Sequence, residues 1–291
     1  MNLIKITLIQ TELFWEDTVQ NLSNFSDKLE DIKEETDIIV LPEMFSTGFT
    51  MNAEKCAEAE NGRTMEWMKQ KAKEKKAVIA GSLIIKEDID KINPKFEIRN
   101  PKYNFYNRLF WVEPNGKYYK YDKRHLFRLG DEQLYYTQGK EKLITELKGW
   151  KFRPLVCYDL RFPVWSKNRL NKKNNTNDLR LTTYDYAYDC LIYVANWPLK
   201  RINAWRALLV SRAIENMSYV IGVNRIGNDG NGISHPGYSM AVDFKGNIIY
   251  ECKPDTEVVE TIQLSHKQLD DYRQHYGFAL DWDNFTINSE Q

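Results

Sequence analysis

Cysteine is scarce in this chain, and what there is forms no recognisable cluster. The sequence has four cysteines in 291 residues, at positions 56, 157, 190 and 252, and none of them belongs to a CxxC pair. Disulfide frameworks and zinc sites both need cysteines at short, regular spacings. We therefore expect four free thiols and no metal site.

Long hydrophobic runs and an excess of charge of either sign are also missing. No stretch approaches 18 consecutive apolar residues, and the opening MNLIKITLIQTELFW lacks the basic flank and cleavage site of a signal peptide. The 41 basic and 41 acidic side chains cancel, so no overall field would attract nucleic acid or an anionic membrane. These absences predict a cytoplasmic protein with neither nucleic acid nor membrane as a partner.

The first third of the chain alternates between strand and helix patterns. Residues 3–10 and 37–42 are short β-rich runs, and apolar residues recur at helical spacing over 19–32 between them. An amphipathic stretch, 64–76, then precedes the apolar run 77–85. That run is too apolar for a strand wetted on one face, so the sheet is expected to be buried on at least one side.

The rest of the chain continues this pattern without a break in composition. Further strands or hairpins are expected at 103–123 (turning at 114–116), 151–160, 190–197, 218–227 and 238–251, and a long helix at 204–216. Because no linker divides these elements, residues 1–291 are read as a single α/β domain with mixed sheets.

Two segments look peripheral to this domain, and a third is a turn. Residues 167–185 are rich in Asn and Lys, which favours an exposed insertion over a basic patch that touches nucleic acid. Residues 265–291 form a C-terminal arm that begins with an amphipathic helix. The GNDGNG stretch at 227–232 lacks the Lys and Ser/Thr of a phosphate-binding loop and is read as a plain turn.

One cysteine occupies a position that suggests chemistry. Cys157 ends an apolar run in RPLVCYDLRFPVW, and a nucleophilic thiol with a pKa of about 8.5 needs a base to become a thiolate. His125 or His235 could supply it. Glu43, just beyond the strand in IIVLPEMFSTGF, is the other candidate, because desolvation there would suit a carboxyl group to proton transfer.

A cation at a third strand end could complete such a site. Lys123 ends the aromatic strand in YYKYDKRHLF, where an ammonium group could offset a developing oxyanion. Taken one at a time, Glu43, Lys123 and Cys157 could equally be a surface carboxylate, an exposed lysine and a buried core thiol.

Together the three segments resemble a known family. LPEMF with Glu43, YDKRHLF with Lys123 and VCYDLRFP with Cys157 are similar, in order and spacing, to the Glu-Lys-Cys triad of the nitrilase superfamily of carbon-nitrogen hydrolases. The segments CYDLRFPVW, YVANWP and LLVSRAIEN look most like the bacterial omega-amidase branch, which acts on 2-oxo acid amides such as 2-oxoglutaramate and 2-oxosuccinamate. The resemblance covers nearly the whole chain and implies a four-layer αββα sandwich that pairs as a homodimer through the helices after Cys157.

The resemblance also implies roles. Glu43 would be the general base, Cys157 the nucleophile that forms a thioester, and Lys123 with the backbone N–H of Tyr158 would hold the oxyanion. A second family glutamate matches Glu132, which would orient Lys123 and keep it charged. No step requires a metal or an organic cofactor.

Other residues are expected to recognise the substrate. Arg201 would bind the substrate carboxylate through a bidentate pair, and Phe45, Asn196 and Trp197 would form pocket walls, with ordinary core packing as the alternative for the aromatic residues. Arg161 is expected to pair inside the domain. The alternatives are another amide or carbamoyl hydrolase of the superfamily, a nitrilase in the strict sense, and a catalytically silent binding or scaffold protein on the same fold.

Overall fold

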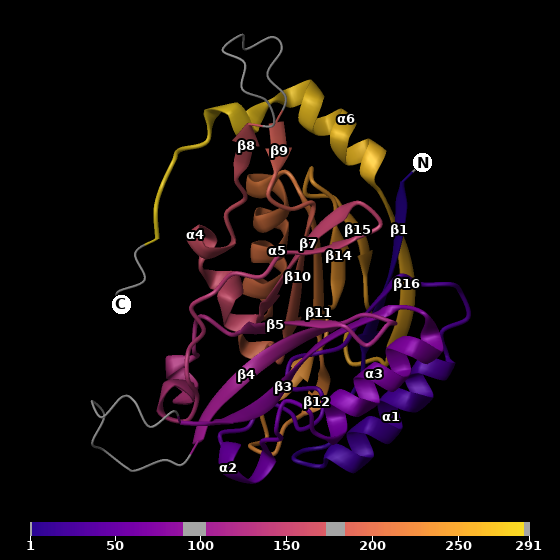
Figure 1. The fold of residues 1–291 in the computed structure, drawn as a ribbon, viewed down its shortest axis with the longest axis vertical. Coiled ribbons are helices and arrows are strands. Elements are labelled where there is room, and N and C mark those ends of the chain that lie inside the picture. Colours follow the sequence, from indigo (N-terminus) through magenta and orange to yellow (C-terminus); the bar gives the residue numbers. More distant parts are fainter. Residues whose placement is uncertain (1, 90–102, 173–183, 288–291) are drawn as a thin grey trace.

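The computed structural model describes residues 2–89, 103–172 and 184–287, whose core is two six-stranded sheets (Figure 1). The first sheet runs, in spatial order, β16 (Val258–Ser265), β1 (Leu3–Gln10), β2 (Ile38–Val40), β3 (Val78–Asp88), β4 (Tyr103–Val112) and β5 (Tyr118–Asp122). The second runs β15 (Ile248–Glu251), β14 (Met240–Val242), β11 (Tyr219–Asn224), β10 (Cys190–Ala195), β7 (Trp150–Val156) and β6 (Thr145–Leu147). Two short ladders pair β8 (Leu170–Lys172) with β9 (Tyr184–Tyr186) and β12 (Ile226–Asn228) with β13 (Ser234–Pro236).

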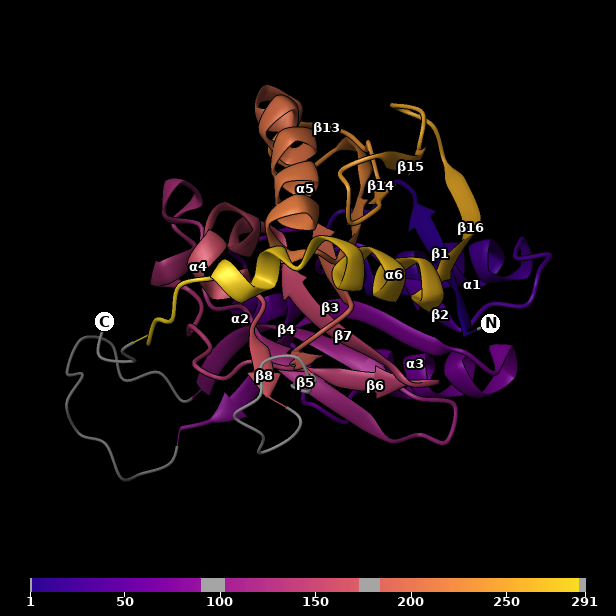
Figure 2. The same ribbon diagram turned by 90° about the horizontal axis from the view of Figure 1, so that it is seen from above.

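Helices cover these sheets, and short 3-10 turns connect them. The α-helices are α1 (Thr18–Glu30), α2 (Ala53–Cys56), α3 (Arg63–Lys75), α4 (Pro163–Ser166), α5 (Ile202–Asn216) and α6 (His266–Tyr276). The 3-10 turns are η1 (Arg128–Gly130), η2 (Glu132–Leu134), η3 (Cys157–Arg161), η4 (Leu199–Arg201) and η5 (Phe278–Asp281). Helices α1 and α3 lie side by side against the first sheet, and α5 lies against the second (Figures 1 and 2).

The two-residue period of the strands explains these layers. In β1, Ile4, Ile6 and Leu8 belong to the core between the sheets, which also contains Phe152 of the second sheet. The next residue of β1, Ile9, belongs instead to the core beneath α1 and α3. Alternate side chains of a strand point to opposite faces, so each strand of this kind buries one face against the other sheet and one against helices.

The second sheet is covered more closely by its helix. A Cβ atom on Gly222 of β11 would lie 2.6 Å from Cδ1 of Leu209 and 2.8 Å from Cζ2 of Trp205, both on α5. A larger residue there would force the side chains of Leu209 and Trp205 to shift. The arrangement is a helix, sheet, sheet, helix sandwich, which confirms the αββα architecture and the single domain.

The element predictions are confirmed closely, with small shifts at the ends. The helix predicted at 64–76 is Arg63–Lys75, the one at 204–216 begins at Ile202, and the strand at 77–85 continues to Asp88. The run predicted as one strand over 218–227 divides into β11 and β12 on either side of Arg225. The 227–232 stretch is the predicted turn, since Asp229 accepts hydrogen bonds from the backbone N–H groups of Asn231 and Ile233.

The two peripheral segments are seen only in part. Within the insertion predicted at 167–185, the described ends pair as β8 and β9, while residues 173–183 lie outside the described residues. The C-terminal arm contains α6, which runs across the molecule near the N-terminus (Figure 1). Arg273 on α6 reaches back to Asp189 at 2.6 Å and to the carbonyls of Tyr188 and Met217, so this arm is fixed to the domain.

The described part of the chain has neither a membrane-spanning helix nor a cluster of metal ligands. None of its helices combines the length and apolarity needed to cross a membrane. Over the same residues, no three His, Cys, Asp or Glu side chains come together as metal ligands would. All four cysteines are free thiols.

A histidine at the start of α6 makes the stability of this arm depend on pH. His266 lies 3.4 Å from Asp189 and 2.8 Å from Asp270, and its ring meets the face of Trp150 edge-on. Hydrogen bonds to the two aspartates raise the pKa of His266 to about 9, above the ordinary value near 6.5. Arg273 also pairs with Asp189, at 2.6 Å.

The protonated form of His266 is therefore favoured by folding. Its contribution should be complete below about pH 6.5 and lost as the pH rises through about 9, a difference on the order of 1–3 kcal/mol in the free energy of unfolding. Denaturant unfolding at pH 6 and pH 9.5 should show this loss in the wild type and not in His266→Gln. His275→Gln, on an exposed position of the same helix, is the matched control. If the free energy of unfolding fell equally between pH 6 and pH 9.5 in the wild type and in His266→Gln, the pH dependence could not be assigned to His266.

Candidate active site

Four strands end at one buried cluster of polar side chains. Glu43 follows β2 and Lys123 follows β5 in the first sheet, while Cys157 follows β7 and Asn196 follows β10 in the second. Glu43 is fully buried and Lys123 is 1% exposed. The close packing of the two sheets thus brings together residues that are up to 153 positions apart in the chain.

Glu43 is held by donors on both of its carboxylate oxygens. Its Oε1 accepts from Nζ of Lys123 at 2.9 Å and from Nδ2 of Asn107 at 2.8 Å. Its Oε2 accepts from the backbone N–H of Asn196 at 2.9 Å, and the Asn196 side chain donates to the Glu43 carbonyl at 2.6 Å. One carboxylate is therefore fixed by groups from both sheets.

Glu132 forms the other side of the cluster. It is fully buried in η2, and Nζ of Lys123 lies 3.0 Å from its Oε1 and 2.9 Å from its Oε2. The backbone N–H of Phe127 donates to Oε2 at 2.6 Å. The ammonium group thus lies between two carboxylates and 5.0 Å above the ring of Phe49.

Burial and charge act in opposite directions on this lysine. Burial lowers the pKa of Lys123, but the carboxylates of Glu132 and Glu43 outweigh it, so the net pKa is raised. Burial also raises the pKa of Glu132, in spite of Lys123. Lys123 is therefore a permanently charged ammonium group.

The thiol beside this cluster is neutral at rest. Burial raises the pKa of the Cys157 thiol well above the ordinary value, and the negative charge of Glu43 adds to this, although Lys123 opposes the shift. A neutral thiol beside a carboxylate has an acceptor for its proton at the moment of attack.

The backbone aims the thiol out of the sheet. Cys157 has φ +42°, a left-handed conformation that costs a non-glycine residue stability. Asp159 holds the turn by accepting from the backbone N–H of Val156 at 3.1 Å, the Tyr121 hydroxyl at 2.8 Å and the backbone N–H of His125 at 3.0 Å. Tyr158, whose N–H was predicted to hold an oxyanion, is the next residue in the same 3-10 turn.

One candidate histidine has another partner, and the other is buried in a short strand. Nδ1 of His125 lies 2.7 Å from Asp159, and its ring stacks on Phe162 with centroids 3.8 Å apart. His235 lies in β13, where burial lowers its pKa to about 4. The thiol lies beside a carboxylate, so the Cys-His alternative finds no support.

Two guanidinium groups lie at the mouth of the site. Arg201 lies 4.9 Å above the ring of Phe127, and its electrostatic neighbours are Cys157, Arg161 and Tyr158. Burial, reinforced by Arg161, lowers the pKa of Arg201. Arg161 lies 5.1 Å above the ring of Trp197.

Neither guanidinium group has a carboxylate partner within the described residues. The ion pair expected for Arg161 inside the domain is therefore not found there. Arg161 and Arg201 remain two adjacent positive charges near the thiol, which is an arrangement suited to an anionic ligand.

Of the three residues predicted as pocket walls, two lie at the site and one lies in the hydrophobic core. Asn196 contacts Glu43 directly, and its Oδ1 is buried without a partner. Trp197 is 2% exposed, with its face toward Arg161 and its Nε1 bonded to the carbonyl of Arg201. Phe45 instead packs against Phe25 and Trp67 in the core beneath α1 and α3, so its assignment to a pocket wall is corrected.

Asn107 and Asp159 belong to the cluster and its support but were not predicted. Asp159 lies in the same VCYDLRFP segment as the cysteine, so the sequence alone could have suggested it as a site residue. Asn107 is a polar residue inside an aromatic-rich strand, and only the register of β4 against its neighbours brings it to Glu43.

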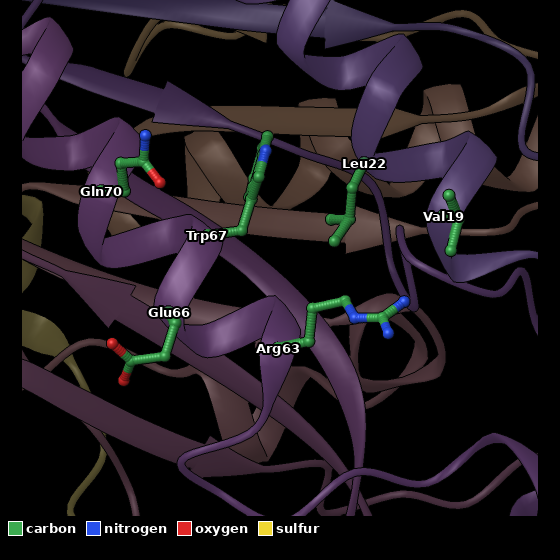
Figure 3. Close-up of a pocket in the computed structure, with 6 residues that line it drawn as sticks. All are labelled: Val19, Leu22, Arg63, Glu66, Trp67 and Gln70. Atoms are coloured by element: carbon green, nitrogen blue, oxygen red, sulfur yellow. The ribbon is translucent and has the colours of Figure 1, made fainter.

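A surface groove elsewhere on the molecule has no such cluster. It lies between α1 and α3, has a volume of about 380 Å³ and is lined by Val19, Leu22, Arg63, Glu66, Trp67 and Gln70 (Figure 3). Its charged side chains, Arg63 and Glu66, both come from α3 and point away from each other (Figure 3).

Comparisons with known proteins identify the family. The carbon-nitrogen hydrolase family model matches residues 5–274. The chain is 41% identical to omega-amidase YafV of Escherichia coli K12 over 284 residues, or 98% of each chain. It is 29% identical to 2-oxoglutaramate amidase of Bacillus subtilis over 249 residues, or 84% of this chain and 85% of the relative.

Solved structures show the same fold. The crystal structure of XC1258 from Xanthomonas campestris, a CN-hydrolase superfamily protein with an arsenic adduct in its active site, has a TM-score of 0.87 and 36% identity, covering 99% of this chain and 100% of that one. Nit3 of Saccharomyces cerevisiae, from branch 10 of the nitrilase superfamily, has a TM-score of 0.75 at 23% identity, covering 94% of each chain. The family resemblance that the three motifs predicted is confirmed, and the chain belongs to the carbon-nitrogen hydrolase family of the nitrilase superfamily.

Proposed function

We propose that the protein is an omega-amidase that hydrolyses 2-oxo acid amides to the 2-oxo acid and ammonia through a thioester on Cys157. The observation that carries the mechanism is the place of Glu43, which binds the ammonium group of Lys123 and is the carboxylate with the largest electrostatic effect on the thiol of Cys157. The activities of the omega-amidase and 2-oxoglutaramate amidase relatives support the choice of substrate.

The first half of the reaction forms the acyl-enzyme. Glu43 accepts the thiol proton while the sulfur of Cys157 attacks the amide carbon, and the carbonyl oxygen becomes an oxyanion. Lys123 and the backbone N–H of Tyr158 stabilise this oxyanion. The C–N bond then breaks, Glu43 returns its proton to the leaving nitrogen, and ammonia departs from a thioester.

The second half releases the acid. Glu43, ionised again, takes a proton from water as the water oxygen attacks the thioester carbon. Collapse of the second tetrahedral intermediate breaks the C–S bond, and the sulfur regains its proton from Glu43. Glu132 orients Lys123 throughout and balances its charge, and the free Oδ1 of buried Asn196 offers an acceptor for the substrate's amide N–H.

Arg201 is the proposed anchor for the substrate carboxylate, with Arg161 beside it. Both guanidinium groups lie near Cys157 and lack carboxylate partners in the described residues, so an anionic substrate would supply the missing charge. An uncharged amide or nitrile would leave both unpaired.

Replacing the nucleophile should abolish hydrolysis without unfolding the protein. Cys157→Ala and Cys157→Ser should show no ammonia release, because the thioester cannot form, while circular dichroism remains that of the wild type. Iodoacetamide should inactivate the wild type through this one residue, as mass spectrometry would show. Cys190→Ala is the matched control and should retain activity. Substantial turnover by Cys157→Ala would refute the mechanism.

Replacing Arg201 should weaken substrate binding, whereas replacing Lys123 should slow the chemical step. Arg201→Ala removes a charge-assisted contact made in the ground and transition states, so KM should rise about tenfold or more with a smaller change in kcat. Lys123→Met should instead lower kcat by about 100-fold or more, because the oxyanion that Lys123 stabilises exists only during the reaction. Thermal melts must accompany the lysine variant, since it leaves two carboxylates without their cation.

A substrate panel tests the assignment itself. We expect kcat/KM for 2-oxoglutaramate or 2-oxosuccinamate to exceed that for simple nitriles by at least about 100-fold. The panel should include glutamine and carbamoyl compounds, which would identify another hydrolase of the superfamily. Equal values for an uncharged nitrile, with no effect of Arg201→Ala, would overturn the omega-amidase assignment and leave the proposed Cys157 chemistry intact.

We also propose a homodimer formed through the elements that follow Cys157. Val164 on α4, Leu199 on η4 and Ile214 on α5 are at least half exposed, and exposed apolar side chains on these elements would be covered in a protein interface. Light scattering should give twice the monomer mass for the wild type and a reduced mass for Val164→Glu/Ile214→Glu. Val19→Glu, on α1 in the other helical layer, is the control. A strictly monomeric, fully active wild type would refute the proposal.

A further inference from the structure

Asn107 touches all three charged residues of the cluster. Its Nδ2 donates to Oε1 of Glu43 at 2.8 Å and to Oε1 of Glu132 at 3.3 Å. Its main-chain carbonyl accepts from the backbone N–H of Lys123 at 2.9 Å. This residue of β4 is fully buried, so none of these contacts competes with solvent.

The charge balance explains why such a donor is needed. With both carboxylates ionised, Glu43 and Glu132 bring two negative charges to the cluster, Lys123 brings one positive charge, and the Cys157 thiol brings none. One buried negative charge therefore remains, and neutral donors must stabilise it. The backbone N–H groups of Asn196 and Phe127 each serve one carboxylate. Among the described side chains, Asn107 and Lys123 are those that hydrogen-bond to both.

The arrangement leaves the amide oxygen of Asn107 without a hydrogen bond. Oδ1 is buried without a hydrogen-bond partner, and an unpaired buried acceptor is unfavourable. Leucine has a similar volume and would avoid that cost. The opposite orientation of the amide would turn Oδ1 toward two carboxylates, where it would be repelled. Stability alone therefore does not explain an asparagine here, whereas the two bonds from Nδ2 do.

We propose that Asn107 is a positioning residue that keeps the Glu43 and Glu132 pair ionised and holds Glu43 toward the thiol of Cys157. The inference rests on the proposed role of Glu43 as the base. Without the Asn107 donor, the pair takes up a proton at a higher pH, and a protonated Glu43 cannot accept the thiol proton.

The test is a pair of pH profiles for the full chain carrying Asn107→Leu. The first is kcat/KM for 2-oxoglutaramate, and the second is the rate at which iodoacetamide alkylates Cys157. Each profile has an acid limb, the range in which the rate falls as the pH is lowered. In both profiles the midpoint of this limb should rise by about one pH unit or more, the size expected for losing one hydrogen bond to a charged group. KM at the pH optimum should change little, because Asn107 does not contact the substrate.

Two further variants make the result decisive. Asn107→Asp keeps the side-chain shape but adds a third carboxylate, so it should move the limb further and it carries the test if Asn107→Leu fails to fold. Asn104→Leu, the same substitution on the same strand, should leave the limb unchanged. A lower rate with an unshifted acid limb in both Asn107 variants would mean a purely structural role and overturn the inference.

The alkylation profile needs no substrate, which separates the two proposals. A shifted alkylation limb with no turnover of any 2-oxo acid amide would support the role of Asn107 and refute the omega-amidase assignment. A wild-type alkylation profile that Glu43→Gln leaves unaltered would refute Glu43 as the base, and the inference with it.

Discussion

The placement of one buried ammonium group between two buried carboxylates is the constraint on which the site depends. Lys123 cannot leave Glu43 or Glu132 without exposing an uncompensated charge to the protein interior, which is a large penalty. The cluster is therefore rigid, and rigidity is what a group needs if it is to stabilise charge that appears only during a reaction. Its side chains come from different strands and turns of the two sheets, so the cluster exists only in the assembled sandwich.

The rest of the fold can be read as support for that placement. The two sheets pack face to face through apolar side chains such as Ile6 and Phe152, which brings Glu43 of one sheet against Asn196 of the other. Asp159 then holds the strained turn that carries Cys157. The apolar layers supply the stability, and part of it is used to bury charge and to hold a left-handed cysteine at the site.

The family and the local chemistry were accessible from the sequence because they depend on short segments. The motifs around Glu43, Lys123 and Cys157 could be recognised without knowing what lies between them, and strand and helix periods follow from alternation within a few residues. Phe45 shows where this reasoning fails. It stands two residues after Glu43, yet its side chain turns to the core beneath α1 and α3, and nothing within LPEMF distinguishes the two directions.

By itself, the sequence determined the order of strands and helices and, through its family resemblance, the αββα class, and it suggested three side chains as reactive. Only the tertiary structure decided which groups meet. It placed Glu43 and Glu132 around Lys123 and paired His125 with Asp159, brought Asn107 to two carboxylates, and left Arg161 without a carboxylate partner in the described residues. The physical reason is that hydrogen bonds and ion pairs act over about 3 Å, while the register and stacking that bring these groups within reach are set by packing across the whole core.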